Sequence, residues 1–337
     1  MNRFIVGTGR CGSTLLSTMI AENPAVLSLF EFFNGLDGTR RFQPAPMSGS
    51  AYRDLICEVH PFLHMVLERG YDVPEVTYPF GARGAPFGAR GARFDRKTGV
   101  PWVLGVTLPR LSDAPDALYD ALRAFLERAP ARPPAAHASA LFAWLMERCG
   151  RSVWVERSGA ALDYLGELDA RFEDARFLHI HRTGEEAALS MREHHAFRLA
   201  IMLTFQLPPG TGRSTEQLRR AAPDDDRIGQ MLASRPSAEY FGRFWTEQVR
   251  RGMAAVPKLD PRRYHEVRFE DLVARPRELI AEVAEFLELP DAQGAWLERA
   301  AGLVRGAPKS RADELPPDEA ERLREACRPG NALLGRA

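Results

Sequence analysis

Three residues into the chain, the sequence reads Phe4-Ile5-Val6-Gly7-Thr8-Gly9-Arg10-Cys11-Gly12-Ser13-Thr14-Leu15-Leu16. Its three leading apolar residues predict a short buried strand. The glycines permit positive φ angles and a close approach of the backbone, and Ser13 and Thr14 are typical of a helix N-terminus. A strand, a glycine-rich turn and a helix in this order present unpaired N–H groups and the positive end of the helix dipole. The stretch therefore predicts an anion site.

The turn nearly matches the phosphate-loop pattern G-x-x-x-x-G-K-[ST], with Gly7 and Gly12 at the two glycine positions. Ser13 stands where that pattern has its lysine, and Arg10 is the only cation in the turn. Enzymes that use nucleoside triphosphates need this lysine on the β- and γ-phosphates. We therefore expect the turn to hold a phosphate without handling a γ-phosphoryl group.

The segment from Gly9 to Leu16 resembles the 5′-phosphosulfate loop of sulfotransferases, R-[SC]-G-[ST]-[ST]-L-L. These enzymes use 3′-phosphoadenosine 5′-phosphosulfate (PAPS) as sulfuryl donor. The resemblance implies that Arg10 lies against the leaving 5′-phosphate and the transferring SO₃ group. It also implies that the loop binds the donor through Arg10, Cys11, Gly12, Ser13 and Thr14.

A second anion site is indicated in the middle of the chain. Arg182 follows a predicted strand over 176–181, and Ser190 lies eight residues later on the helix that follows. A guanidinium can bind a phosphate bidentately, and a serine two turns along the helix can add a hydroxyl. Sulfotransferases show the same strand–Arg–x7–Ser–helix arrangement for the 3′-phosphate of the donor. Two convergent anion sites suit a donor with phosphates at both ends.

Other segments also resemble the family. Residues 153–158 are similar to its W-x-E-K-[TS]-P strand, with Arg157 in place of lysine. Residues 267–272 are similar to its R-Y-E-D-L segment, with Phe269 in place of tyrosine. The resemblance covers about 1–31 and 150–310.

Near the end of the chain, Arg305 and Lys309 stand where the family has a basic strap over the 3′-phosphate and the adenine. The resemblance implies that both bind the donor.

The general base is indicated less directly. Glu31 follows the second predicted strand, Val26–Phe30, and should lie beside the first turn. In tyrosyl-protein and several bacterial sulfotransferases a glutamate at this place acts as the base, so the resemblance implies that role here. A buried carboxylate near the donor suits the task. A salt bridge to a nearby arginine is the structural alternative, and His194 and His195 are rival bases.

Composition restricts the remaining possibilities. The 337 residues include 45 Lys and Arg and 45 Asp and Glu, and this balance argues against a general nucleic-acid binder. The four cysteines are widely spaced, so neither a disulfide framework nor a zinc site is expected. No basic-then-apolar leader and no apolar run of 18 residues occur, and we expect a soluble, cytoplasmic protein without a membrane partner.

Alternating strand and helix patterns predict an α/β fold with a parallel central sheet flanked by helices. The resemblance makes this the P-loop NTPase-like sulfotransferase fold. We expect a single domain over 1–337, with substrate-side insertions around 36–100 and 195–240. Residues 79–100 contain a repeated Phe-Gly-Ala-Arg-Gly-Ala sequence, which is either a basic lid or a solvated loop. Six strands are expected, at 4–6, 26–30, 102–106, 152–156, 176–181 and 264–269. A helix is expected from Tyr52 to Arg69, where apolar residues recur with helical spacing.

Taken together, these features predict a PAPS-dependent sulfotransferase that acts on a hydroxyl of a small-molecule or glycan acceptor. The acceptor should bind in the two insertions. Because the family needs no metal, none is expected as a cofactor. The alternatives are a small-molecule kinase of the phosphate-loop type, or a donor-binding protein without catalysis. The sequence does not indicate an oligomeric state.

Overall fold

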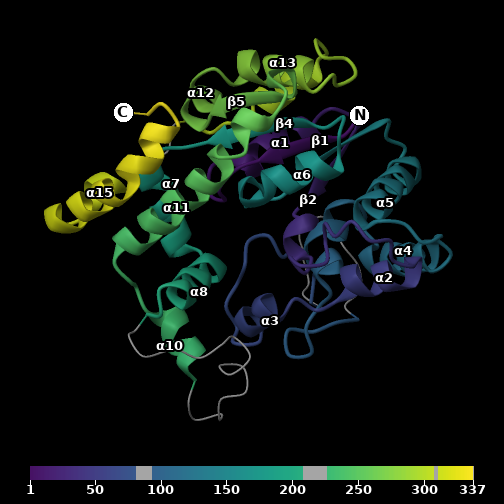
Figure 1. The fold of residues 1–337 in the computed structure, drawn as a ribbon, viewed down its shortest axis with the longest axis horizontal. Coiled ribbons are helices and arrows are strands. Elements are labelled where there is room, and N and C mark those ends of the chain that lie inside the picture. The colour runs from purple at the N-terminus through teal and green to yellow at the C-terminus, as the bar shows by residue number, and fades with distance from the viewer. Residues whose placement is uncertain (81–92, 208–225, 307–309, 337) are drawn as a thin grey trace.

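A parallel five-stranded sheet forms the centre of the protein (Figure 1). The computed structural model describes residues 1–80, 93–207, 226–306 and 310–336. The strand order is β2-β3-β1-β4-β5, and every pairing between neighbours is parallel. The strands are β1 (Arg3–Val6), β2 (Val26–Phe30), β3 (Val153–Arg157), β4 (Arg176–His181) and β5 (Tyr264–Arg268). The predicted α/β class with a parallel sheet is confirmed.

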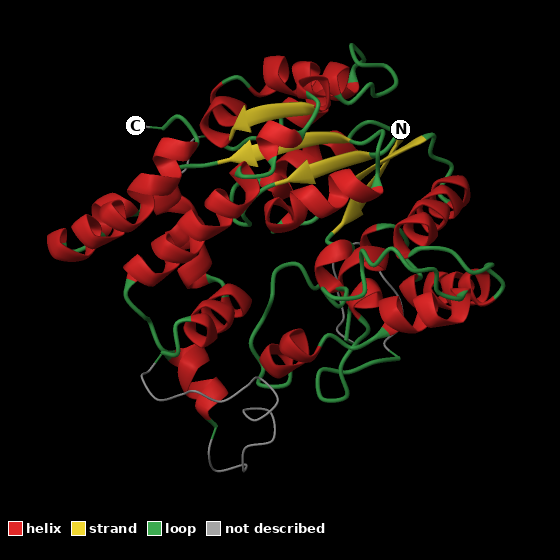
Figure 2. Cartoon of the chain, viewed as in Figure 1, coloured by secondary structure: helices red, strands yellow, loops and turns green. Residues whose placement is uncertain are grey.

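Successive residues of β1 face opposite sides of the sheet, as strand geometry requires. Ile5 is buried with α1 (Ser13–Ala21), α13 (Pro276–Phe286) and α14 (Trp296–Ala301). Phe4 and Val6 are buried in a larger cluster with α5 (Pro134–Arg148) and α6 (Leu165–Arg171). Helices therefore cover both faces of the sheet, as Figure 2 shows.

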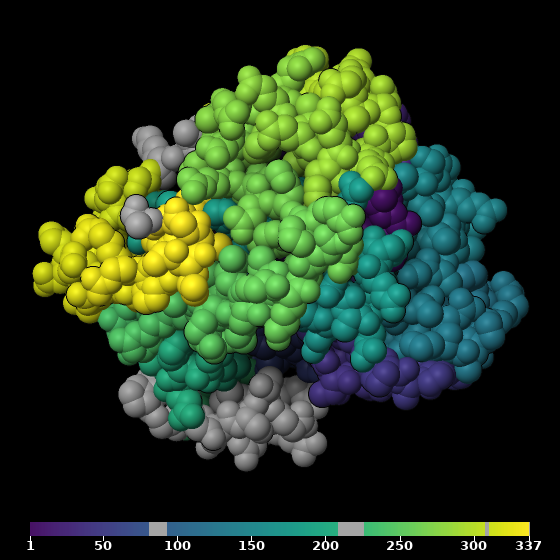
Figure 3. Space-filling model, turned by 45° about the horizontal axis from the view of Figure 1, so that its top comes forward, coloured from purple at the N-terminus to yellow at the C-terminus, as the bar shows by residue number. Residues whose placement is uncertain are grey.

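Three further helices pack together beside this sandwich. Helix α15 (Pro317–Leu333) packs against α11 (Ala238–Met253) and α7 (Gly184–Glu193). Figure 3 shows this C-terminal segment, in yellow, at one end of the molecule. The apolar stripe of α11, with Phe241 and Trp245, joins these three helices in a core of their own. The other helices are α2 (Gly49–Cys57), α3 (Pro61–Leu67), α4 (Pro115–Glu127), α8 (His195–Thr204), α10 (Arg227–Ala233) and α12 (Phe269–Ala274).

One predicted strand is wrong. Residues Val103–Thr107 form a π-helical turn rather than the strand expected at 102–106. All five are buried, and a short apolar run in a fully buried place has no periodicity that separates helix from strand. The turn packs beside the sheet, because Thr107 Oγ1 donates a hydrogen bond to the carbonyl of Phe30 at 2.9 Å.

The helix predicted from Tyr52 to Arg69 is two helices, α2 and α3. Pro61 lacks an N–H group and disfavours a helical residue before it, so it begins α3 instead of lying inside a helix. Most of the repeated stretch at 79–100 lies outside the described residues. Within the ranges given above, no helix is long and apolar enough to cross a bilayer.

Candidate active site

The candidate site lies where the strands end. The turn 7–12 follows β1, Glu31 follows β2, Arg157 ends β3 and Arg182 follows β4. The carboxyl ends of parallel strands share one edge of the sheet, which is where open α/β sheets bind ligands. One pocket with a volume of about 430 Å³ is lined by Gly9, Arg10 and Gly12 of the turn and by Glu31, Arg157 and Arg182.

The turn after β1 has the backbone conformation that the glycines predict. Gly9, Arg10 and Gly12 have φ angles of 76°, 55° and 98°, and Gly12 directly precedes α1. In the part of the chain that the structure describes, no group accepts a hydrogen bond from the N–H groups of Ser13 and Thr14. These donors and the positive end of the helix dipole are therefore open to an anion, and the anion site itself stays a prediction.

The residues named for the two predicted anion sites, Arg10, Arg182 and Ser190, line this pocket together. Arg10 Nε donates a hydrogen bond to Ser190 Oγ at 3.1 Å. Arg182 also lines the pocket, and its guanidinium lies 4.8 Å from the centre of the Phe269 ring. A Cβ on Gly12 would overlap that same ring. Phe269, which replaces a tyrosine of the family pattern, thus connects the first turn to Arg182 by packing.

Glu186 holds the side chain of Arg182 and the backbone at Arg311 in position. Its carboxylate forms an ion pair with Arg182 at 3.1 Å and accepts a hydrogen bond from the N–H of Arg311 at 2.6 Å. Arg311 lines the pocket and was missed by the sequence argument, although it stands close behind the predicted strap. Arg305 is exposed and is not among the residues of this pocket, and Lys309 lies outside the described residues.

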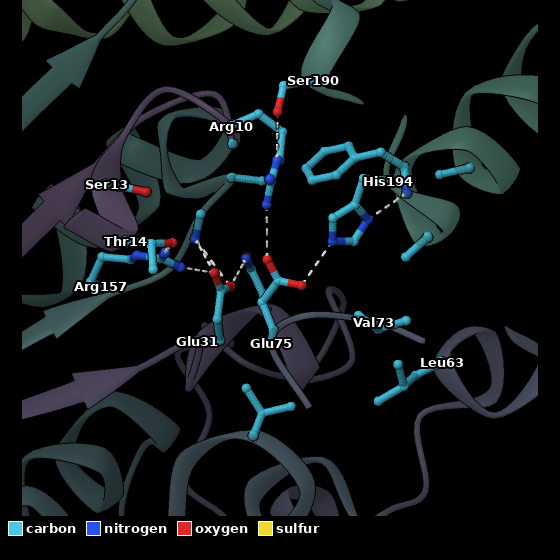
Figure 4. A pocket seen from close by; sticks show the side chains of 18 of the residues that line it. Arg10, Ser13, Thr14, Glu31, Leu63, Val73, Glu75, Arg157, Ser190 and His194 are labelled. Atoms are coloured by element: carbon cyan, nitrogen blue, oxygen red, sulfur yellow. Dashed lines mark hydrogen bonds and ion pairs between the residues drawn. The ribbon is translucent and has the colours of Figure 1, made fainter. Parts of the chain in front are cut away.

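Glu31 lines the pocket and is almost completely buried. Its carboxylate forms an ion pair with Arg157 and accepts hydrogen bonds from Asn34 and from the N–H of Gly159. Arg157 also donates to the hydroxyl of Thr14 (Figure 4). The expected alternative of a salt bridge to a nearby arginine is therefore present, with Arg157 as the partner.

A second carboxylate, that of Glu75, lies against Arg10 and was missed by the sequence argument. Glu75 Oε1 is 3.3 Å from Arg10 Nη1, and Glu75 Oε2 is 2.8 Å from His194 Nε2 (Figure 4). Burial acts to raise the pKa of Glu75, but the hydrogen bond and charge of His194 and the charge of Arg10 outweigh it and lower that pKa. Nothing in the sequence near Glu75 indicates this contact.

The two histidines differ in position. His194 lines the pocket, whereas His195 is absent from its lining and its Nδ1 is 3.0 Å from the carbonyl of Asp72. Of the described residues, no three His, Cys, Asp or Glu side chains are arranged to hold a metal ion.

Comparisons with known proteins point to one family. A model described as "Sulfotransferase family" matches residues 105–293, more than half of the 337 residues. The match includes Arg157, Arg182 and Ser190 but not the turn after β1. It begins earlier than the region from 150 that the sequence motifs indicated. No curated protein matches the chain.

Solved structures of sulfotransferases also align with the chain. A sulfotransferase domain from the curacin biosynthetic pathway has 14% identity and a TM-score of 0.45 over 96% of both chains. Sulfotransferase STF1 from Mycobacterium tuberculosis H37Rv has 18% identity and a TM-score of 0.45, over 97% of this chain and 76% of the other. A sulfotransferase from Alicyclobacillus acidocaldarius has 14% identity and a TM-score of 0.39, over 99% and 93%. By the extent of the family-model match, the chain belongs to the sulfotransferase family.

Proposed function

We propose that this protein transfers a sulfuryl group from PAPS to a hydroxyl of a small-molecule or glycan acceptor. The observation that carries the proposal is the contact between Arg10 Nε and Ser190 Oγ at 3.1 Å. It joins a turn suited to a 5′-phosphosulfate with a helix suited to a 3′-phosphate.

The residues present fit such a donor. Ser13 and Thr14 offer N–H groups that have no acceptor within the described ranges, and Arg10 adds a charge beside them. Arg182 and Ser190 are almost completely buried, so an anion held there is shielded from solvent. PAPS, when bound, supplies the sulfuryl group and a good leaving group. Arg10 then stabilises the charge that develops on the equatorial and leaving oxygens.

We propose Glu31 as the general base. The acceptor oxygen forms its bond to sulfur as the bond from sulfur to the 5′-phosphate breaks, and the hydroxyl proton passes to a carboxylate oxygen of Glu31. The products are the sulfate ester and 3′-phosphoadenosine 5′-phosphate. Arg157 and Asn34 hold the carboxylate in place. His194 is the alternative base, because it lines the same pocket and is oriented by Glu75.

A phosphate-loop kinase is the competing enzymatic function. It accounts for the turn after β1, but Ser13 occupies the position of the lysine that such kinases need. It also assigns no role to the buried Arg182 and Ser190.

The test measures binding and transfer separately. Calorimetry should detect 3′-phosphoadenosine 5′-phosphate without added metal, and ³⁵S from labelled PAPS should appear in hydroxyl acceptors. Magnesium-dependent binding of ATP, without binding of the bisphosphate, would favour the kinase. Binding of the bisphosphate without transfer to any acceptor would indicate a donor-binding protein.

A further inference from the structure

We propose that the acceptor is an uncharged alcohol or phenol, whose apolar body lies against one side of the pocket. This side, here named the apolar arm, consists of Phe62, Leu63, Val73, Val76, Phe197 and Ala200. The inference rests on the proposed function, because it assigns an apolar part of the same pocket to the acceptor.

The apolar arm is built by the two predicted insertions, around 36–100 and 195–240. Helix α3 supplies Phe62 and Leu63, and helix α8, which contacts α3, supplies Phe197 and Ala200. Val73 and Val76 come from the segment that follows α3. The arm thus comes from the stretches 36–100 and 195–240, and no strand-end residue belongs to it.

The apolar arm begins beside the donor turn. The Phe197 ring packs against Gly9, where a Cβ would collide with it. Leu63 and Val73 lie on the opposite side of Glu75 and His194 from Thr14 and Arg157 (Figure 4). Both are almost completely buried, with 3% and 6% of their surface exposed. An acceptor in the arm can therefore reach the transferring group while its body is removed from water.

Charge on the pocket wall argues against an acidic acceptor. Among the described lining residues the cations are Arg10, Arg157, Arg182 and Arg311. Each of them is paired with a carboxylate. Arg10 pairs with Glu75 and Arg157 with Glu31, and Glu186 pairs with both Arg182 and Arg311. All four belong to the donor side, so an acidic group in the apolar arm would be desolvated without a counter-charge from the described lining residues.

A sugar fits the apolar arm equally poorly. A glycan presents hydroxyls on most of its surface, and each one buried against valine, leucine or phenylalanine loses its hydrogen bonds to water. A single hydroxyl, in contrast, finds polar partners at the inner end. Glu75 and His194 stand there, 2.8 Å apart, next to Arg10. The arm thus suits one hydroxyl on an apolar body.

Two phenols and one sugar of similar size test this class of acceptor. We would titrate 4-propylphenol, 3-(4-hydroxyphenyl)propanoate and methyl glucoside into the full chain saturated with 3′-phosphoadenosine 5′-phosphate. Their rates of sulfation would be measured with labelled PAPS. We expect 4-propylphenol to bind, and to exceed the other two by at least about tenfold in affinity and in kcat/KM.

Leu63→Ser should reduce the affinity for 4-propylphenol by about tenfold or more, since it removes apolar contact from the arm. Leu333→Ser is the matched control, because Leu333 lies on α15 with 48% of its surface exposed. Val76→Thr, at a half-buried position, changes polarity with little change of shape and should act in the same direction if Leu63→Ser fails to fold. Affinity for the bisphosphate should stay unchanged in all three variants.

The outcomes separate the two proposals. If the bisphosphate binds but the propanoate or the glucoside matches 4-propylphenol, the apolar acceptor class is overturned and the donor site stands. The same holds if 4-propylphenol fails to bind, or if Leu63→Ser and Val76→Thr bind it like the wild type. If the bisphosphate itself does not bind, the proposed function fails.

Discussion

Arg10 Nε donates a hydrogen bond to Ser190 Oγ although 180 residues separate them in the chain. Parallel pairing of β1 with β4 causes this contact, because it puts the turn after β1 next to the helix that follows β4. The two residues belong to different elements, and each helps to hold the other in position. Their interaction is the most direct point at which the proposed function can be tested.

Replacing Arg10 and Ser190 singly and together should reveal coupled effects. We expect Ser190→Ala to weaken binding of 3′-phosphoadenosine 5′-phosphate about tenfold, since a hydrogen bond to a charged group is worth about 1.5–3 kcal/mol. Arg10→Ala should lower the transfer rate by about 10²–10³. Calorimetry and rates on the double variant would measure the coupling. Arg262→Ala, at a position whose side chain is 89% exposed, should change neither quantity. Strictly additive effects would contradict a shared site.

Gly12→Ala should remove donor binding. Gly12 has a φ angle of 98°, and a Cβ would overlap the Phe269 ring, so the start of α1 must shift. We expect a loss of more than about tenfold in affinity for the bisphosphate together with a lower Tm. Gly38→Ala is the matched control, because nothing lies within 4 Å of the added Cβ there. A Gly12→Ala variant that binds like the wild type would show that the turn does not hold the donor.

Glu31 and His194 can be separated by the pH dependence of kcat. If Glu31 is the base, Glu31→Gln should lower kcat by about 10²–10⁴ and abolish the acidic limb of the profile. Glu31→Asp, which keeps a carboxylate, should retain part of the transfer rate and should keep the acidic limb of the pH profile. Because Arg157 loses its partner in Glu31→Gln, affinity for the bisphosphate serves as the check on folding. If instead His194→Gln removes the acidic limb and Glu31→Gln keeps it, His194 is the base.

Glu156→Gln should stabilise the protein at alkaline pH. Glu156 is completely buried, and burial, partly opposed by hydrogen bonds from Ser158 and Phe32, raises its pKa from 4.5 to about 8. The folded state therefore keeps a proton that the unfolded state loses between these pH values, so stability falls as pH rises through that window. Urea unfolding at pH 5, 6.5 and 8 measures the free energy of unfolding of both proteins. The value for the variant should rise relative to that of the wild type, on the order of 1.4 kcal/mol per pH unit. A difference independent of pH would refute a protonated Glu156.

Sequence patterns located the strands of the sheet but did not predict which strands pair with one another. Alternating apolar runs and helical periods indicated the five strands and the long helices, because these signals are local. The run at 102–106 was assigned incorrectly, because a fully buried segment carries no alternation. The helical periodicity over 52–69 is interrupted by Pro61, which begins a new helix because the residue before a proline avoids the helical conformation. This effect is also local and visible in the sequence.

The residues of the candidate site likewise fall into those that the sequence indicated and those that it did not. Arg10, Arg182, Ser190 and Glu31 were identified because each stands at a strand end or in a recognisable motif, and all four line the pocket. Glu75, in contrast, belongs to an irregular segment without a motif. Its contacts with Arg10 and His194 cannot be inferred from position along the chain.

The sequence by itself determined most of the elements and the glycine-dependent conformation of the first turn, since both depend on residues that are close together in the chain. Only the tertiary structure decided which charged groups share the pocket. It paired Arg157 with Glu31 and Glu75 with His194, and it placed an apolar wall opposite them. The physical reason is that strand order and loop path set distances between residues far apart in the chain, and these distances determine which charges are paired.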